Sequence, residues 1–142
     1  MSRINMVRVI LGGLVAGLVI NIGEFILNMP ILGSQWAEAL RALNRPPLDE
    51  QPPTFFIILA FLLGILTVWI YAAIRPRFGA GPRTAVSAGL MMWLLSILYP
   101  MAGALPMHLF PTRMLVIATI WEFFELPLAA LAGAYFYREE AE

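Results

Sequence analysis

Two glutamates interrupt the last apolar stretch of the sequence. Glu122 and Glu125 lie near the middle of residues 114–137, which would form about 36 Å of helix, enough to cross a membrane. An ionised side chain at that depth costs about 2.5–3.5 kcal/mol, whereas each Leu, Ile, Phe or Val returns only about 0.3–0.6 kcal/mol. We therefore expect these carboxyl groups to be neutral, paired or turned away from lipid.

The spacing of small residues places both glutamates on an interior face of this helix. Ala118, Glu122, Glu125, Ala129 and Gly133 recur at intervals of three and four, which is one face of an α-helix, while bulky side chains occupy the opposite face. Small residues in a membrane helix let a second backbone approach closely. The pattern therefore predicts that another helix packs against the glutamates.

The composition predicts one all-α integral membrane domain. The chain is 61% hydrophobic and 13% charged, with a mean hydropathy of +0.81, which is untypical of soluble domains. Its formal net charge of zero gives no reason to expect nucleic acid as a partner, and the absence of cysteine excludes thiolate metal sites and disulfides. Four apolar stretches predict an antiparallel bundle of four transmembrane helices within a single domain, residues 1–142, with spans at about 9–29, 54–74, 84–104 and 114–137.

The arginines predict the orientation of the bundle. Six of the nine arginines share one side of this topology, which by the positive-inside rule places both termini in the cytoplasm. The first span lacks a cleavage site, so we expect a retained anchor in the lipid bilayer of a bacterial inner (plasma) membrane. In the first outer loop, the spacing of Trp36, Leu40 and Leu43 predicts a short amphipathic helix at about 35–44 on the membrane surface. Alternatively, Trp36 closes the top of the bundle.

The first span carries a stripe that could pair with the last span. Its members run from small to polar as the chain leaves the cytoplasm: Gly13, Gly17, Asn21, Glu24 and Asn28. One antiparallel register places these residues opposite Gly133, Ala129, Glu125, Glu122 and Ala118, respectively. This register predicts that the polar ends of the two stripes form a cluster in the middle and outer part of the membrane. The glycine and alanine ends would be helix-packing contacts.

The two central spans show a weaker pattern of the same kind. Small and hydroxyl-bearing residues share one face of each span, and the two faces would match as an antiparallel pair. Thr67, Ser96 and Tyr99 would then supply hydroxyl groups to the bundle interior. The alternative is that Thr67 and Ser96 bond to their own backbone and that Tyr99 marks a membrane interface.

A cluster of Glu24, Glu122, Glu125, Asn21 and Asn28 could carry protons, hold a cation or a small polar ligand, or join helices through neutral hydrogen bonds. Ionisable residues inside a membrane indicate a functional site by default, and we expect at least one of the three acids to be protonated at neutral pH. A purely structural seam would contribute about 0.6–2 kcal/mol per hydrogen bond. The spacing does not match a di-metal site, which uses Glu-x-x-His pairs, so no resident metal is predicted and no cofactor is identified.

The sequence is compatible with three functions. The first is a small binding or transport protein whose carboxyl cluster takes up a proton, a cation or a small polar ligand. The second is an accessory subunit of a larger membrane complex in which the cluster is an interhelical seam. The third, more remote, is an intramembrane enzyme that uses a carboxyl group as acid or base. With only four spans, transport would require a homo-oligomer or a larger assembly.

Overall fold

The computed structural model describes residues 3–139, and within this range it contains helices and connecting turns but no strand. The helices are α1 (Met6–Ile26), α2 (Gly33–Ala42), α3 (Pro53–Phe78), α4 (Pro82–Trp93), α5 (Tyr99–Ala104) and α6 (Thr112–Phe136). A π-helical turn at Leu27–Ile31 extends α1, and a second one at Leu94–Leu98 joins α4 to α5. Short 3-10 turns lie at Leu48–Glu50 and Leu105–Met107.

Four helical segments are long and apolar enough to cross a membrane: Met6–Ile31, Pro53–Phe78, Pro82–Met107 and Thr112–Phe136. Each contains 25 or 26 residues, so three of them extend past both ends of the predicted spans and the last is shifted by one or two residues. These lengths and compositions indicate an integral membrane protein. The helix at Gly33–Ala42 lies close to the position predicted for the loop helix.

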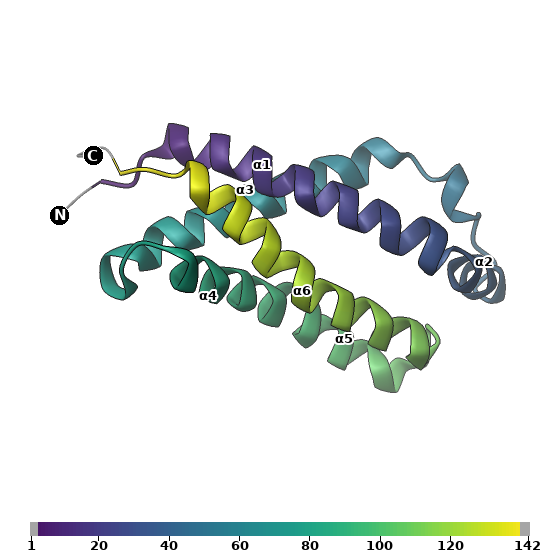
Figure 1. The fold of residues 1–142 in the computed structure, drawn as a ribbon. Helices are drawn as coiled ribbons and strands as arrows, with labels where there is room; N and C mark the ends of the chain where they lie inside the picture. The colour runs from purple at the N-terminus through teal and green to yellow at the C-terminus, as the bar shows by residue number, and fades with distance from the viewer. Residues whose placement is uncertain (1–2, 140–142) are drawn as a thin grey trace.

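The long helices pack so that α6 lies between α1 and α4, and α3 runs along α1 (Figure 1). Both described ends of the chain, together with the α3–α4 turn, lie at one end of the bundle, which we call the terminal end (Figure 1). The opposite end holds α2 and the connection from α5 to α6, and we call it the α2 end. The helix α1 therefore has two neighbours, where the sequence pattern had suggested one.

Glycines bring α1 and α3 into backbone contact. A side chain on Gly64 of α3 would overlap the backbone of Gly13 and Gly17 in α1, and side chains on those two glycines would overlap Ile65 and Phe61. The predicted pairing of Gly13 with Gly133 and of Gly17 with Ala129 is therefore wrong. The face of α1 that carries Gly13 and Gly17 is rotated by about one residue from the face that meets α6. Both glycines therefore face α3.

A different set of small residues joins α6 to its two neighbours. On one side, Gly133 packs against Gly12 of α1, and a Cβ added to Gly12 would lie 2.5 Å from the carbonyl oxygen of Gly133. On the other side, Gly89 of α4 packs against the backbone at Pro127. The predicted match between the faces of the second and third spans is therefore not the one that forms, since Gly64 faces α1 and Gly89 faces α6.

Prolines explain the two π-helical turns. The turn at Leu27–Ile31 contains Pro30, and the turn at Leu94–Leu98 ends two residues before Pro100. A proline lacks the N–H that an α-helix needs and clashes with the preceding turn. One extra residue in the turn lets the helix continue: the N–H of Leu32 donates to the carbonyl of Leu27, 2.8 Å away.

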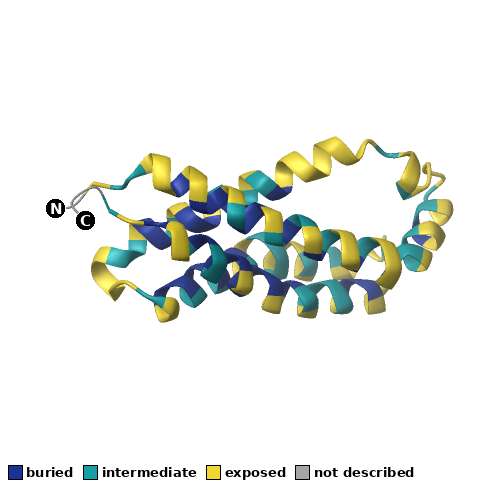
Figure 2. Cartoon of the chain, turned by 45° about the horizontal axis from the view of Figure 1, so that its top comes forward, coloured by how far each residue is buried: buried dark blue, intermediate teal, exposed yellow. Residues whose placement is uncertain are grey.

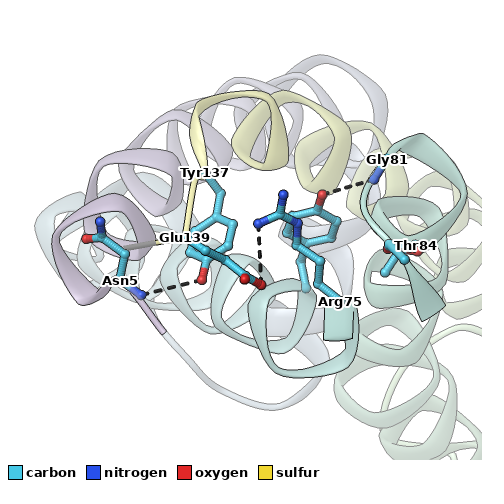
Figure 3. Close-up of polar contacts among 8 residues, drawn as sticks. Asn5, Arg75, Gly81, Thr84, Tyr137 and Glu139 are labelled. Atoms are coloured by element: carbon cyan, nitrogen blue, oxygen red, sulfur yellow. Dashed lines mark hydrogen bonds and ion pairs between the residues drawn. The ribbon is translucent and has the colours of Figure 1, made fainter. Parts of the chain in front are cut away.

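A polar cluster fastens the terminal end (Figure 3). Arg75 of α3 pairs with Glu139 at 3.4 Å, and its guanidinium lies 5.6 Å from the centre of the Tyr137 ring. The Tyr137 hydroxyl accepts a hydrogen bond from the backbone N–H of Asn5, so the start and the end of the chain are tied together. The hydroxyl of Tyr71 accepts from the N–H of Gly81 in the α3–α4 turn.

Burial is uneven along the bundle (Figure 2). The largest core cluster joins α1, α3, α4 and α6 and includes Val9, Val68 and Leu126, which are fully buried. The first two turns of α3 differ, because residues 52–59 are all exposed. In a membrane these side chains would contact acyl chains, which solvate apolar groups as well as a protein core does.

The glycine contact between α1 and α3 predicts an asymmetry between two alanine substitutions. We expect Gly64→Ala to lower the free energy of unfolding by about 1–3 kcal/mol, because the added methyl group overlaps the α1 backbone. Gly103→Ala in α5 meets nothing within 4 Å and should be neutral or slightly stabilising. Denaturant titration in mixed micelles measures both. Equal effects of the two variants would contradict the packing of Gly64 on α1.

Candidate functional site

Three carboxyl groups from two helices meet in the middle of the bundle. Each of Glu24, Glu122 and Glu125 places one oxygen atom within 4.8 Å of an oxygen of the other two. Glu122 and Glu125 on α6 are only 5% and 6% exposed, and Glu24 on α1 is half-buried. The last and first spans thus bring their acids together inside the protein, with no other helix between them.

Gly23 makes room for this meeting. A side chain at Gly23 would overlap the carboxyl group of Glu125, so the acid lies directly against the α1 backbone. One residue further along α1, Glu24 places a carboxyl oxygen within 4.8 Å of one from Glu122. Two carboxyl groups at this spacing can share a hydrogen bond only if one of them carries a proton.

Asn28 and Trp36 extend the cluster toward the α2 end. The side-chain amide of Asn28 donates to Oε2 of Glu24 at 2.7 Å and to the Glu24 carbonyl at 2.9 Å. The indole N–H of Trp36 in α2 donates to Oδ1 of Asn28 at 2.9 Å. These bonds form a continuous polar chain from α2 to the carboxyl cluster. Trp36 also contacts Phe110 edge to face, so its ring faces the bundle, as in the second of the two alternatives for this residue.

Trp121 supplies a second indole donor to the cluster. Its N–H donates to Oε2 of Glu125, one turn further along α6. The Trp121 ring packs against a small apolar core at the α2 end that contains Leu27, Leu32 and Met114. Trp36 packs against the same core, so the core and the Asn28 chain lie together at the α2 end.

Two carboxyl oxygens keep unused bonding capacity. Oε2 of Glu122 and Oε1 of Glu125 are buried and have no hydrogen-bond partner in the part of the chain that the structure describes. A buried acceptor without a partner is unfavourable by about 1–3 kcal/mol, more if it is charged. Within residues 3–139, the one ion pair found joins Arg75 to Glu139 and lies at the terminal end. The cluster therefore has donors on one oxygen each of Glu24 and Glu125, and open acceptor positions on Glu122 and Glu125.

Apolar packing closes the cluster toward the terminal end. Ile20 of α1, Val68 of α3 and Leu126 of α6 are at most 1% exposed and belong to one core cluster. Below them, Gly12 and Gly133 bring the backbones of α1 and α6 together. The polar chain through Asn28 and Trp36 runs in the opposite direction. The hydrogen-bonded chain from the acids thus leads toward the α2 end.

The structure does not bring the remaining predicted residues into the cluster. Asn21 faces α3, where its amide donates to the carbonyls of Gly17 at 2.9 Å and Ile57 at 3.4 Å, so the predicted pairing with Glu125 does not form. The hydroxyls of Thr67 and Ser96 donate to the carbonyls of Leu63 and Met92 in their own helices. Tyr99 is 79% exposed. Ala129 is buried in the main core, next to the acids on the same face of α6.

Gly23 and Trp121 belong to the site although the sequence pattern did not single them out. Gly23 directly precedes Glu24. A glycine next to an intramembrane acid can indicate that another group lies close to the backbone there. Trp121 stands four residues before Glu125, the spacing at which side chains meet on a helix. A tryptophan in an apolar span is more often a lipid-facing or interfacial residue, which hides this role.

No family model, curated protein or solved structure matches this chain. The chemistry of the site therefore has to be argued from its own geometry.

Gly23 provides a direct test of the site. In Gly23→Ala, the new methyl group should displace the Glu125 carboxyl and break its hydrogen bond with Trp121. The indole N–H signal of Trp121 in a 15N-labelled sample should shift, while that of Trp93, bonded to the Thr119 carbonyl, should stay in place. Gly33→Ala is the matched control, because its Cβ would meet only the Asn28 carbonyl at 3.7 Å. An unchanged Trp121 signal in Gly23→Ala would refute the contact.

Proposed function

We propose that this protein is a small membrane protein whose carboxyl cluster reversibly binds a proton or another small cation. The observation that carries the proposal is the pair of buried, unpartnered oxygens on Glu122 and Glu125, in a cluster of three acids to which no basic side chain of residues 3–139 is paired. If the cluster served only to join the helices through hydrogen bonds, each buried carboxyl oxygen would be expected to have a donor. Here, Asn28 and Trp121 donate to Oε2 of Glu24 and of Glu125, whereas Oε2 of Glu122 and Oε1 of Glu125 stay open.

The proposed topology places both termini in the cytoplasm and α2 on the outer face. Most arginines lie at the terminal end, including Arg75, Arg77 and Arg83 near the α3–α4 turn, which supports this orientation. The polar chain from α2 then gives the cluster an entrance from the outer face. In this arrangement Trp36 and α2 cover the entrance, and binding precedes any transport step. Release on the cytoplasmic side would require the core around Ile20 and Val68 to open.

The accessory-subunit alternative makes a different use of the same residues. It is supported by the close approach of the Glu24 and Glu122 carboxyl groups, because a hydrogen bond shared between them would link α1 to α6 without any ligand. If that bond is the purpose of the cluster, neutral glutamine side chains should replace it with little loss. The two functions therefore separate by the effect of cations on the folded protein.

Substitution of the acids tests the proposed function. A cation that binds only the folded state stabilises it by about 2.7 kcal/mol at about 100 times its Kd. We expect at least one of Na⁺, K⁺, Mg²⁺, Ca²⁺ or Mn²⁺ to raise the Tm of the purified full chain, or the infrared carboxyl band to report a protonation change. Glu122→Gln and Glu125→Gln should abolish that response while the protein remains folded.

Glu38→Gln is the control for this experiment, because Glu38 is exposed on α2 and should leave every response unchanged. If the wild-type protein and Glu122→Gln show the same Tm with every cation and the same infrared carboxyl band, the binding function is excluded. The cluster is then an interhelical seam.

Single cysteines test the orientation cleanly, because the natural chain contains no cysteine. A membrane-impermeant maleimide added to intact cells should label Asp49→Cys, in the connection after α2, and should not label Ala80→Cys, in the α3–α4 turn. Both should react after the membrane is permeabilised. Labelling of Ala80→Cys but not Asp49→Cys in intact cells would reverse the topology and place the entrance on the cytoplasmic face.

A further inference from the structure

We propose that the occupant of the carboxyl cluster is a hard divalent cation of the Mg²⁺, Mn²⁺ or Ca²⁺ class, bound by Glu24, Glu122 and Glu125. This inference rests on the proposed function and narrows it to one class of ligand. It stands on the spacing of the three acids, on the hydrogen bonds that hold Glu24 and Glu125, and on the close packing at Gly23.

The spacing of the oxygens fits one central ion. Three ligand atoms, one from each acid, lie within 4.8 Å of one another. Mg²⁺ binds oxygen at about 2.0–2.1 Å and Ca²⁺ at about 2.3–2.6 Å, so two ligands on opposite sides of one ion are separated by about 4–5 Å. A single ion can therefore contact all three carboxyl groups without a large movement of α1 relative to α6.

Neighbouring donors hold these acids as metal ligands are commonly held. Asn28 donates to one oxygen of Glu24, and Trp121 donates to one oxygen of Glu125. Two of the three acids, Glu24 and Glu125, are thus fixed in orientation by a neighbouring side chain that is not itself an acid. Hydrogen bonds of this kind orient the ligands at metal sites and raise their affinity. The oxygens left without a partner, on Glu122 and Glu125, belong to side chains that are 5% and 6% exposed.

The donor set selects hard ions. All three side chains offer carboxylate oxygen, which suits Mg²⁺, Ca²⁺ and Mn²⁺ better than soft or borderline metals. The chain contains no cysteine, and its one histidine, His108, lies in the exposed connection that leads into α6. A site for Zn²⁺ or Cu²⁺ would be expected to use nitrogen or sulfur ligands.

Space and charge favour a divalent metal ion over the other cations. A methyl group does not fit between Gly23 and Glu125, so an organic ammonium ion has no room on that side of the cluster. Na⁺ and K⁺ are small enough, but each brings one positive charge to three acids in a region of low dielectric. A divalent ion at the same position offsets twice as much carboxylate charge, and the gain is larger where water is scarce.

Mn²⁺ is the probe for this proposal. The full chain is reconstituted in nanodiscs of phosphatidylcholine, whose zwitterionic headgroups compete little for the ion, and bound Mn²⁺ is measured by electron paramagnetic resonance. We expect one Mn²⁺ per chain, displaced by Mg²⁺ or Ca²⁺ and not by Na⁺. The indole N–H signal of Trp121 should broaden when Mn²⁺ binds, whereas that of Trp69 on the exposed side of α3 should not.

Two kinds of variant separate a metal site from a structural seam. Glu122→Gln and Glu125→Gln remove ligands and should abolish Mn²⁺ binding, and Asn28→Ala should weaken it by about 10–100-fold through loss of the orienting bond. Glu38→Gln on α2 should leave the affinity unchanged. If the glutamine variants fail to fold, Asn28→Ala and the Trp121 signal of the wild-type protein still decide the outcome.

The proposal is overturned if the wild-type chain binds no Mn²⁺, or if Mn²⁺ binds equally well to Asn28→Ala and Glu122→Gln and leaves the Trp121 signal sharp. If divalent ions fail while protons, Na⁺ or K⁺ still give a response that depends on Glu122, this inference falls and the proposed function stands. If no cation gives such a response, both fall.

Discussion

Close approach of the α1 and α6 backbones is the constraint on which the carboxyl cluster depends. Gly12 meets Gly133 at the level of the main core, and Gly23 lets the Glu125 carboxyl lie against α1. A larger side chain at any of these positions would separate the helices and move Glu24 out of reach of Glu122. Because lipid tails solvate apolar side chains as well as a protein interior does, such contacts depend on close packing and on polar bonds. The same contacts therefore hold the helices together and create the site.

The position of α6 between α1 and α4 explains why this helix tolerates unusual residues. Its buried face carries two acids and Pro127, and each is matched by a neighbour: the acids by Glu24 and Gly23 of α1, and the proline by Gly89 of α4. The indole of Trp93 on α4 also donates to the Thr119 carbonyl at 2.9 Å, which adds a polar bond on the proline side. With α6 supported on both sides, the acids are held in place although none of them forms an ion pair with a residue between 3 and 139.

The sequence was sufficient to predict the four long apolar helices and the face of the last one that carries Glu122 and Glu125, because both depend on composition and on the 3.6-residue period. It was not sufficient to predict the register of α1. Gly12 and Gly13 are adjacent in the chain, yet one faces α6 and the other faces α3. A small-residue stripe shows that a helix packs closely and does not show which neighbour it meets. Asn21 was misplaced for the same reason, and Trp121 was missed because an indole in a span has several uses.

The polar chain and the main core lie on opposite sides of the acids, and this has a consequence for any movement of an ion. From Glu24 the hydrogen bonds lead through Asn28 to Trp36, whereas toward the terminal end Ile20, Val68 and Leu126 are almost completely buried. An ion that continued past the cluster would have to separate these side chains and then the contact between Gly12 and Gly133. That contact is also what brings the acids together. Opening such a path would therefore weaken the contact that positions the acids, so the packing argues against a continuous channel along the bundle.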